Sequence, residues 1–295
     1  NDSSGNIDNL PTSIDIAGIG VKLGKGFSIF AGKQCTAYGG IEFDLNPIEI
    51  YEYSDMIENM SNFMTGLNIG YDINAHQQLN LQILDSRNGS FNKTYGVETE
   101  DGEQPAIESG KLPLVYTLNW NGNFNDIFKT RWSASIMNEA KDKNLYYFAF
   151  GNELNLNKFN MFLDFMYSKE GIDRKGIMTG ITGSMEGHNA FDAGYFSMVT
   201  KLNYRFLPKW NAFVKGMYET ASLTKQQGDL EKGKYRTAWG YFAGVEFYPM
   251  DTNLHFFLTY VGRSYDFTAR AKALGQENYS TNRVSVGFIY QLPMF

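Results

Sequence analysis

The sequence predicts an all-β fold, a transmembrane antiparallel β-barrel, and three observations support this prediction. Segments of about ten to fourteen residues alternate between an apolar face and a polar face, which is the period of a strand. Aromatic residues make up 16% of the 295 residues, yet mean hydropathy is −0.35 and no apolar run reaches the roughly 18 residues that a membrane helix needs. Connections alternate between short turns and long polar loops, which is typical of outer-membrane barrels.

Strands of about 9–11 residues are long enough to cross the hydrocarbon of a bilayer when they are tilted. Within 194–206, for example, Leu202 and Tyr204 share one face while Lys201 and Asn203 share the other. The same alternation predicts thirteen strands, at 13–24, 26–34, 61–73, 77–86, 111–120, 126–138, 144–154, 158–168, 191–206, 209–221, 235–248, 253–265 and 281–292.

The connections set the direction of each strand. Short turns are expected at 24–26, 74–76, 121–126, 154–158, 207–209 and 249–253, and long loops at 35–60, 87–110, 169–190, 222–234 and 266–280, with a shorter one at 138–143. Trp120, Tyr204 and Trp210 lie beside short turns, as interfacial aromatic residues do.

The number of strands indicates whether this sequence contains the whole barrel. Single-chain bacterial barrels have an even number of strands, so we expect an odd number of strands upstream and about 16 in the complete protein. Alternatively the segment 13–24, whose apolar parity switches between Ile16 and Ile19, is misassigned or bulged.

Composition argues against several other functions. Cys35 is the only cysteine, and His76, His188 and His255 are scattered without the spacing of metal ligands, so no metal or other cofactor is expected. The net charge of −6 gives no reason to expect nucleic acid as a partner. The glycines of 18–24 lack the dinucleotide-binding spacing, and no Ser/His pair is apparent, so the sequence does not predict an enzyme.

Residues 31–55, AGKQCTAYGGIEFDLNPIEIYEYSD, are the most distinctive stretch, and the chain ends on Phe295. With the ladder of amphipathic strands, this stretch resembles the Bacteroidetes outer-membrane porins grouped as the phosphate-selective porin O and P family. The resemblance implies a bacterial outer-membrane barrel of about 16 strands, commonly a homotrimer, surrounded by outer-membrane lipid and lipopolysaccharide. It also implies passive diffusion of small hydrophilic or anionic solutes.

The loop at 35–60 departs from the phosphate-selective pattern, because it is acidic and carries no basic residue. We therefore expect a general porin and do not carry the family's phosphate selectivity over to this chain. The loop is the candidate constriction, since its Gly-Gly and Asn-Pro dipeptides permit chain reversal into the barrel. Alternatives are a loop that covers the barrel mouth, or a calcium site. The acidic residues proposed for the constriction are Glu42, Asp44, Glu49, Glu52 and Asp55.

Basic residues on the polar faces of the strands are candidates for the pore lining. If they converge at one height, they would face the acidic loop and create a transverse field. Alternatively each pairs with a wall carboxylate such as Asp164, Glu219 or Glu246 and has a structural role. The candidates are Lys129, Arg131, Lys201, Arg205, Lys215, Arg236, Arg263 and Arg283.

The chain is expected to form a single barrel domain over residues 1–295. The leading hypothesis is a passive channel with an aqueous interior. A second is a barrel plugged by its loops that serves as a structural or assembly partner of other envelope proteins. A third is a soluble β sandwich, which would not explain the alternation of short and long connections.

Overall fold

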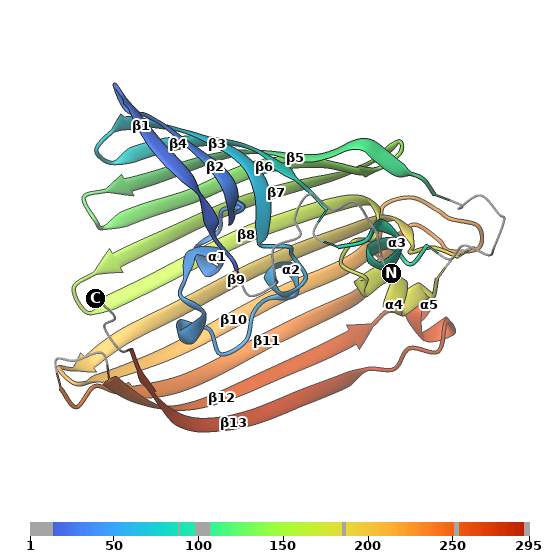
Figure 1. The fold of residues 1–295 in the computed structure, drawn as a ribbon. Helices are drawn as coiled ribbons and strands as arrows, with labels where there is room; N and C mark the ends of the chain where they lie inside the picture. Colours follow the sequence, from blue (N-terminus) through green and yellow to red (C-terminus); the bar gives the residue numbers. More distant parts are fainter. Residues whose placement is uncertain (1–13, 88, 98–106, 185–186, 251–253, 292–295) are drawn as a thin grey trace.

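A single antiparallel sheet of 13 strands, each paired with its neighbours in sequence, makes up the fold (Figure 1). The computed structural model describes residues 14–87, 89–97, 107–184, 187–250 and 254–291. Its strands are β1 (Ala17–Gly24), β2 (Phe27–Cys35), β3 (Phe63–Asn74), β4 (Gln77–Asp85), β5 (Ser109–Phe124), β6 (Phe128–Ala140), β7 (Lys143–Leu156), β8 (Phe159–Ile172), β9 (Phe191–Leu207), β10 (Trp210–Leu223), β11 (Gly233–Phe247), β12 (Leu254–Phe267) and β13 (Tyr279–Tyr290).

The period-2 alternation identified every one of these strands, so the all-β antiparallel prediction is confirmed. The first expected strand is present as β1, and its irregularity lies between Lys22 and Gly24 rather than between Ile16 and Ile19. Within the described residues β1 and β13 pair on one side only, and the total of 16 strands stays a prediction. Phe295 lies outside the described residues.

The outer face of the curved sheet is apolar. Val286 and Phe288 on β13 expose 81% and 65% of their surface, and Tyr204 and Trp210 are exposed beside the turn between β9 and β10. Trp120 packs edge-on against Trp132 with ring centroids 5.1 Å apart. Aromatic and aliphatic side chains exposed over a whole face are stable only where that face contacts lipid or another protein.

Short helices occupy the longer connections. Residues 36–62, which we call the inner loop, join β2 to β3 and contain α1 (Ile41–Asp44), the 3-10 helix η1 (Pro47–Glu49) and α2 (Asp55–Glu58). The helices α3 (Phe91–Tyr95), α4 (Ile177–Thr182) and α5 (Ala269–Ala273) gather at the opposite end of the sheet from most of the short turns (Figure 1). No helix among the described residues is long and apolar enough to span a membrane.

The main buried core lies between the inner loop and the concave side of the sheet. Figure 1 shows the inner loop inside the curve, in front of β8 to β11. Ile41, Met56 and Ile57 of the inner loop pack in one cluster with Phe162 and Met217 of the wall. The hydrophobic contribution of this cluster therefore holds the loop inside the sheet instead of over its rim.

Candidate functional site

Two glycines turn the inner loop onto the concave face. Gly39 and Gly40 adopt φ values of 69° and 88°, which residues with a Cβ adopt only at a cost. The Gly40 amide donates to the Arg131 carbonyl at 2.9 Å, and a Cβ on Gly39 would lie 2.9 Å from that same carbonyl oxygen. Glycine is thus required here both for the backbone conformation and for the close approach to β6.

Asp164 on β8 holds the first turn of α1. Its Oδ1 accepts from the Ile41 amide at 2.9 Å and its Oδ2 accepts from the Glu42 amide at 2.7 Å, and the side chain is fully buried. A carboxylate that accepts the free amides at a helix start satisfies donors that have no partner within the helix. Asp164 therefore fixes where α1 sits on the wall.

Glu42 and Lys215 form a buried ion pair between α1 and β10. The Lys215 Nζ lies 2.5 Å from the Glu42 Oε1, and the side chains are 5% and 0% exposed. The Ser54 hydroxyl donates to the other Glu42 oxygen at 2.6 Å, and Lys215 also donates to the Glu52 carbonyl at 2.8 Å. These extra hydrogen bonds offset the desolvation of both charges, so one lysine fastens two parts of the loop.

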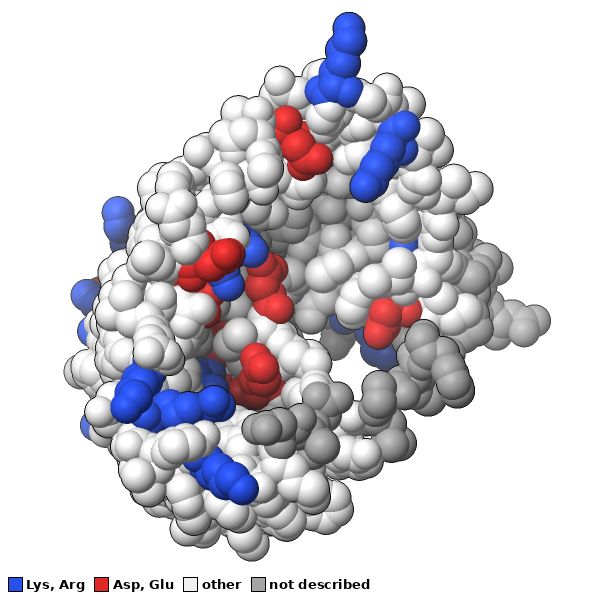
Figure 2. Space-filling view, turned by 90° about the vertical axis from the view of Figure 1, so that its left-hand side faces the viewer, with Lys and Arg blue, Asp and Glu red and all other residues white. Residues whose placement is uncertain are grey.

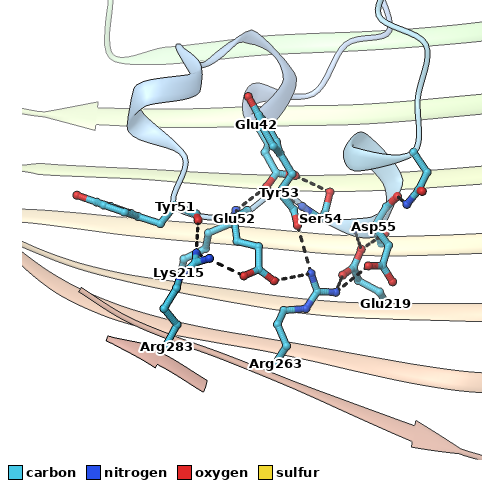
Figure 3. A network of polar contacts seen from close by, with 12 residues as sticks. Glu42, Tyr51, Glu52, Tyr53, Ser54, Asp55, Lys215, Glu219, Arg263 and Arg283 are labelled. Atoms are coloured by element: carbon cyan, nitrogen blue, oxygen red, sulfur yellow. Dashed lines mark hydrogen bonds and ion pairs between the residues drawn. The ribbon is translucent and has the colours of Figure 1, made fainter. Parts of the chain in front are cut away.

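Arg263 on β12 is the centre of a second network, drawn in Figure 3. Its Nη2 donates to Glu219 at 2.6 Å and to Asp55 at 2.9 Å, while its Nη1 donates to the Tyr53 carbonyl at 3.2 Å. Arg236 donates to Asp55 as well, and the Asp55 amide donates to Glu219 at 2.7 Å. The start of α2 is therefore fixed to three strands at once.

Tyr51 attaches the inner loop to the wall through its aromatic ring and its hydroxyl. Its ring stacks on Phe213 with centroids 5.1 Å apart, and its hydroxyl donates to Glu246 at 3.1 Å. Burial and the adjacent Glu246 carboxylate raise the pKa of the Tyr51 hydroxyl, so it stays a hydrogen-bond donor at neutral pH. The aromatic contact thus completes the attachment of the loop.

The strand register brings most of the predicted basic residues together. Four lie on one row of paired residues that crosses eight strands, in the order Lys129, Glu153, Phe162, Lys201, Lys215, Phe242, Val261 and Arg283. Arg131, Asp164 and Arg263 share the next row. Arg205 and Arg236 lie outside both rows.

The predicted acidic and basic residues are mostly in direct contact, not separated across an opening. Arg131 pairs with Asp44 at 2.6 Å, and Arg283 lies 3.6 Å from Glu52, which Arg263 also approaches. Lys129 pairs instead with Glu153 of the wall at 3.4 Å. Glu49, Lys201 and Arg205 are the predicted residues that join no ion pair within the described ranges.

Several residues that position the loop were not predicted. As wall carboxylates, Asp164 and Glu219 were considered only as alternative partners of basic wall residues. Glu219 does pair with Arg263 of the wall and also accepts from a loop amide, whereas Asp164 accepts from two backbone amides of the loop. Ser54 gave no signal in the sequence. The one sequence signal for Asp164 and Glu219 as loop-positioning residues is that both lie on the inward face of their strands.

An aqueous space remains beside the attached loop. A cavity of about 550 Å³ lies at the short-turn end, between η1 and the inner wall. Figure 2, which views the molecule from that end, shows acidic and basic side chains around a hollowed interior. Among the residues that the structure describes, no three His, Cys, Asp or Glu side chains gather as metal ligands would.

Comparison with known proteins identifies a family and similar folds. The family model described as phosphate-selective porin O and P matches residues 1–292. Similar solved structures include the outer membrane channel DcaP of Acinetobacter baumannii, with 11% identity and a TM-score of 0.60 over 88% of this chain and 70% of that one. OccAB2 of Acinetobacter baumannii has 12% identity and a TM-score of 0.51 over 94% of this chain and 67% of that one.

OmpT of Vibrio cholerae, an outer membrane protein folded in vitro, has 11% identity and a TM-score of 0.50 over 90% of this chain and 76% of that one. At these identities the likeness concerns the fold. No curated protein matches the chain.

Proposed function

The chain belongs to the phosphate-selective porin O and P family, and on this premise we propose that it lets small hydrophilic solutes diffuse passively through a water-filled barrel. As a member of this porin family it is a bacterial outer-membrane channel protein with a β-barrel fold. The exposed apolar side of the sheet suits contact with outer-membrane lipid, and its polar concave side suits water.

One observation carries the proposal, namely the attachment of the inner loop inside the sheet. The buried Glu42–Lys215 pair and the contacts of Arg263 with Glu219 and Asp55 hold the loop against the wall. A loop fixed in this way narrows the interior at a constant place without having to move when solutes pass. We therefore assign the constriction to the inner loop, which corresponds to the predicted 35–60 segment.

The charge arrangement supports a general channel more than a phosphate-selective one. The loop carries no Lys or Arg, and six of the eight predicted pore-lining basic residues are in ion pairs. A cation already paired with a carboxylate attracts phosphate less, because the two charges cancel at a distance. Glu49 is exposed and joins no ion pair among the described residues, so it adds negative charge on the open side of the loop.

Finer features of the proposal come from the family resemblance. These are a single barrel domain over residues 1–295, assembly as a homotrimer, contact with lipopolysaccharide, and an origin in the Bacteroidetes. The role is that of a channel rather than an enzyme. A second candidate, a plugged barrel that acts as an envelope assembly partner, is favoured by the same close packing of the inner loop.

Planar bilayer recording of the purified full-length protein, shown beforehand to be folded, separates these candidates. The proposal predicts stepwise openings, and a reversal potential in a salt gradient that is not strongly anion-selective. Strong anion selectivity would mean that Lys201 and Arg205, which join no ion pair among the described residues, control which ions pass. A folded protein that gives no current would favour the plugged barrel.

A further inference from the structure

We propose that the cavity at the short-turn end binds a neutral, hydroxyl-rich solute of the sugar or polyol class. The inference rests on the proposed function, because it assumes that solutes pass through the barrel and so reach this space. The cavity measures about 550 Å³, within the roughly 300–1,000 Å³ that is typical of small-molecule sites. It is therefore large enough for a solute of that class with some of its water.

A ladder of side-chain amides lines one side of the cavity. Asn155 on β7, Asn160 on β8 and Asn203 on β9 are directly paired in the strand register. The Asn203 amide donates to Asn160 Oδ1 at 3.2 Å, and the Asn160 amide donates to Glu153 at 2.6 Å. Each of these two amides keeps a further N–H, so the ladder is held in place and still has hydrogen-bonding capacity.

Hydroxyl groups suit such a ladder better than ions do. A hydroxyl both donates and accepts a hydrogen bond, and a primary amide offers two donors and an acceptor in one plane. Neighbouring strands lie about 4.8 Å apart, which is close to the spacing of alternate hydroxyls along a sugar. One solute can thus contact two or three amides of the ladder at the same time.

The charges that line the cavity sum to zero. Three carboxylates, Glu49, Glu153 and Glu246, face three cations, Lys158, Lys201 and Arg205. Glu246 is already held by donors from Asn211, Tyr51 and Tyr248. An environment with both signs and no excess suits a polar solute without net charge. Lys129, which lies outside the cavity, also pairs with Glu153 and so offsets one of the three negative charges. The cavity then has a slight excess of positive charge, and a solute with a carboxylate is the competitor to be tested.

Lys201 supplies a fixed donor at the edge of the ladder. It is 7% exposed, and its Nζ makes one long hydrogen bond of 3.3 Å to the Glu49 carbonyl. An ammonium group has three donors, and its remaining hydrogens suit the hydroxyl oxygens of a solute. Leu45, Ile48, Phe159 and Phe162 line other parts of the same cavity and suit the C–H faces of a sugar ring.

The test measures block of single-channel ion current by added sucrose in the reconstituted full-length protein. We expect concentration-dependent block by sucrose, with gluconate and a polyethylene glycol of similar size needing higher concentrations. Asn160→Leu and Asn203→Leu conserve volume but remove the amides, and each should raise the half-blocking sucrose concentration by about three- to tenfold, the value of one hydrogen bond. Asn119→Leu, on the inner wall of β5 and outside the cavity, is the matched control.

The outcomes of this experiment test the sugar site separately from the channel function. No current in the wild type would overturn the channel itself. A current that sucrose blocks no better than polyethylene glycol, or block that Asn160→Leu and Asn203→Leu leave unchanged, would overturn only the sugar site. Stronger block by gluconate than by sucrose would mean that the cations control the cavity, and a carboxylate class would replace the neutral one.

Discussion

Lys201 and Lys215 lie directly opposite each other on β9 and β10, yet among the described residues only Lys215 forms an ion pair, with Glu42 of the inner loop. Lys201 reaches the same loop through the Glu49 carbonyl. Two side chains of the same type, on one register row and almost equally buried, therefore have different roles. Lys215 fastens the inner loop, and Lys201 lines the cavity at the short-turn end.

Replacing these two lysines separates the roles. Lys215→Met leaves the buried Glu42 carboxylate without its cation, which costs about 3–5 kcal/mol in comparable buried pairs. Lys201→Met breaks no ion pair within the described part of the chain, and we expect it to lower the free energy of unfolding by less than about 1 kcal/mol. The free energy of unfolding in denaturant, followed by loss of the β-sheet signal in circular dichroism, measures both. Equal losses in the two variants would show that the Glu42–Lys215 pair does not hold the loop.

The close approach of Gly39 to β6 can be tested by comparing it with Gly24, a control glycine that has open space where a Cβ would lie. Gly24 and Gly39 both have positive φ, of 83° and 69°, but a Cβ on Gly24 would have no atom within 4 Å. Gly24→Ala should lower stability by about 1–2 kcal/mol through the backbone alone. Gly39→Ala should lower the free energy of unfolding clearly more than Gly24→Ala does, because the new Cβ would clash with the Arg131 carbonyl. A smaller loss for Gly39→Ala in the same denaturant assay would contradict this packing.

Removal of Arg263 should make the channel more cation-selective. The Arg263→Met variant leaves Glu219 and Asp55 without their shared guanidinium. A unit charge about 7 Å from a passing ion changes the energy of that ion by about 0.6 kcal/mol in water, which is roughly a threefold change in how cations and anions partition into the channel. The reversal potential in a salt gradient should shift accordingly.

Arg270→Met removes the same charge from an exposed pair with Glu231 near α5 and serves as the control for Arg263→Met. We expect little shift in its reversal potential, because that pair is exposed and is screened by salt. Equal shifts in both variants would mean that total charge, and not the Arg263 network, sets selectivity.

Asp164 should keep the ionic current steady. Asp164→Ala removes both hydrogen bonds to the amides that begin α1, and each bond to a charged acceptor is worth about 1.5–3 kcal/mol. We expect the start of the inner loop to fluctuate, which would appear as added noise in the open-channel current. Asp72→Ala, which removes an exposed carboxylate bonded to Gln78, should leave the noise unchanged. Quiet current in Asp164→Ala would contradict the proposed anchoring.

The sequence predicted the strands well because strand identity depends on local alternation. Lys201 and Asn203 could be assigned to the inner face from their parity alone. The row that aligns Lys129 with Arg283 could not be predicted, because it depends on the register of seven successive strand pairs. The Glu42–Lys215 contact joins residues 173 positions apart, and no local pattern encodes so distant a pairing.

The most direct test of the proposed constriction is the single-channel conductance after removal of the inner loop. Residues 41–58 would be replaced by a short Gly-Ser linker, in the full-length protein and with folding verified by circular dichroism. If the inner loop narrows the path as proposed, the wild type conducts in steps and the variant conducts more at the same voltage. A folded variant whose conductance equals that of the wild type would contradict the constriction, because the ions would then pass elsewhere.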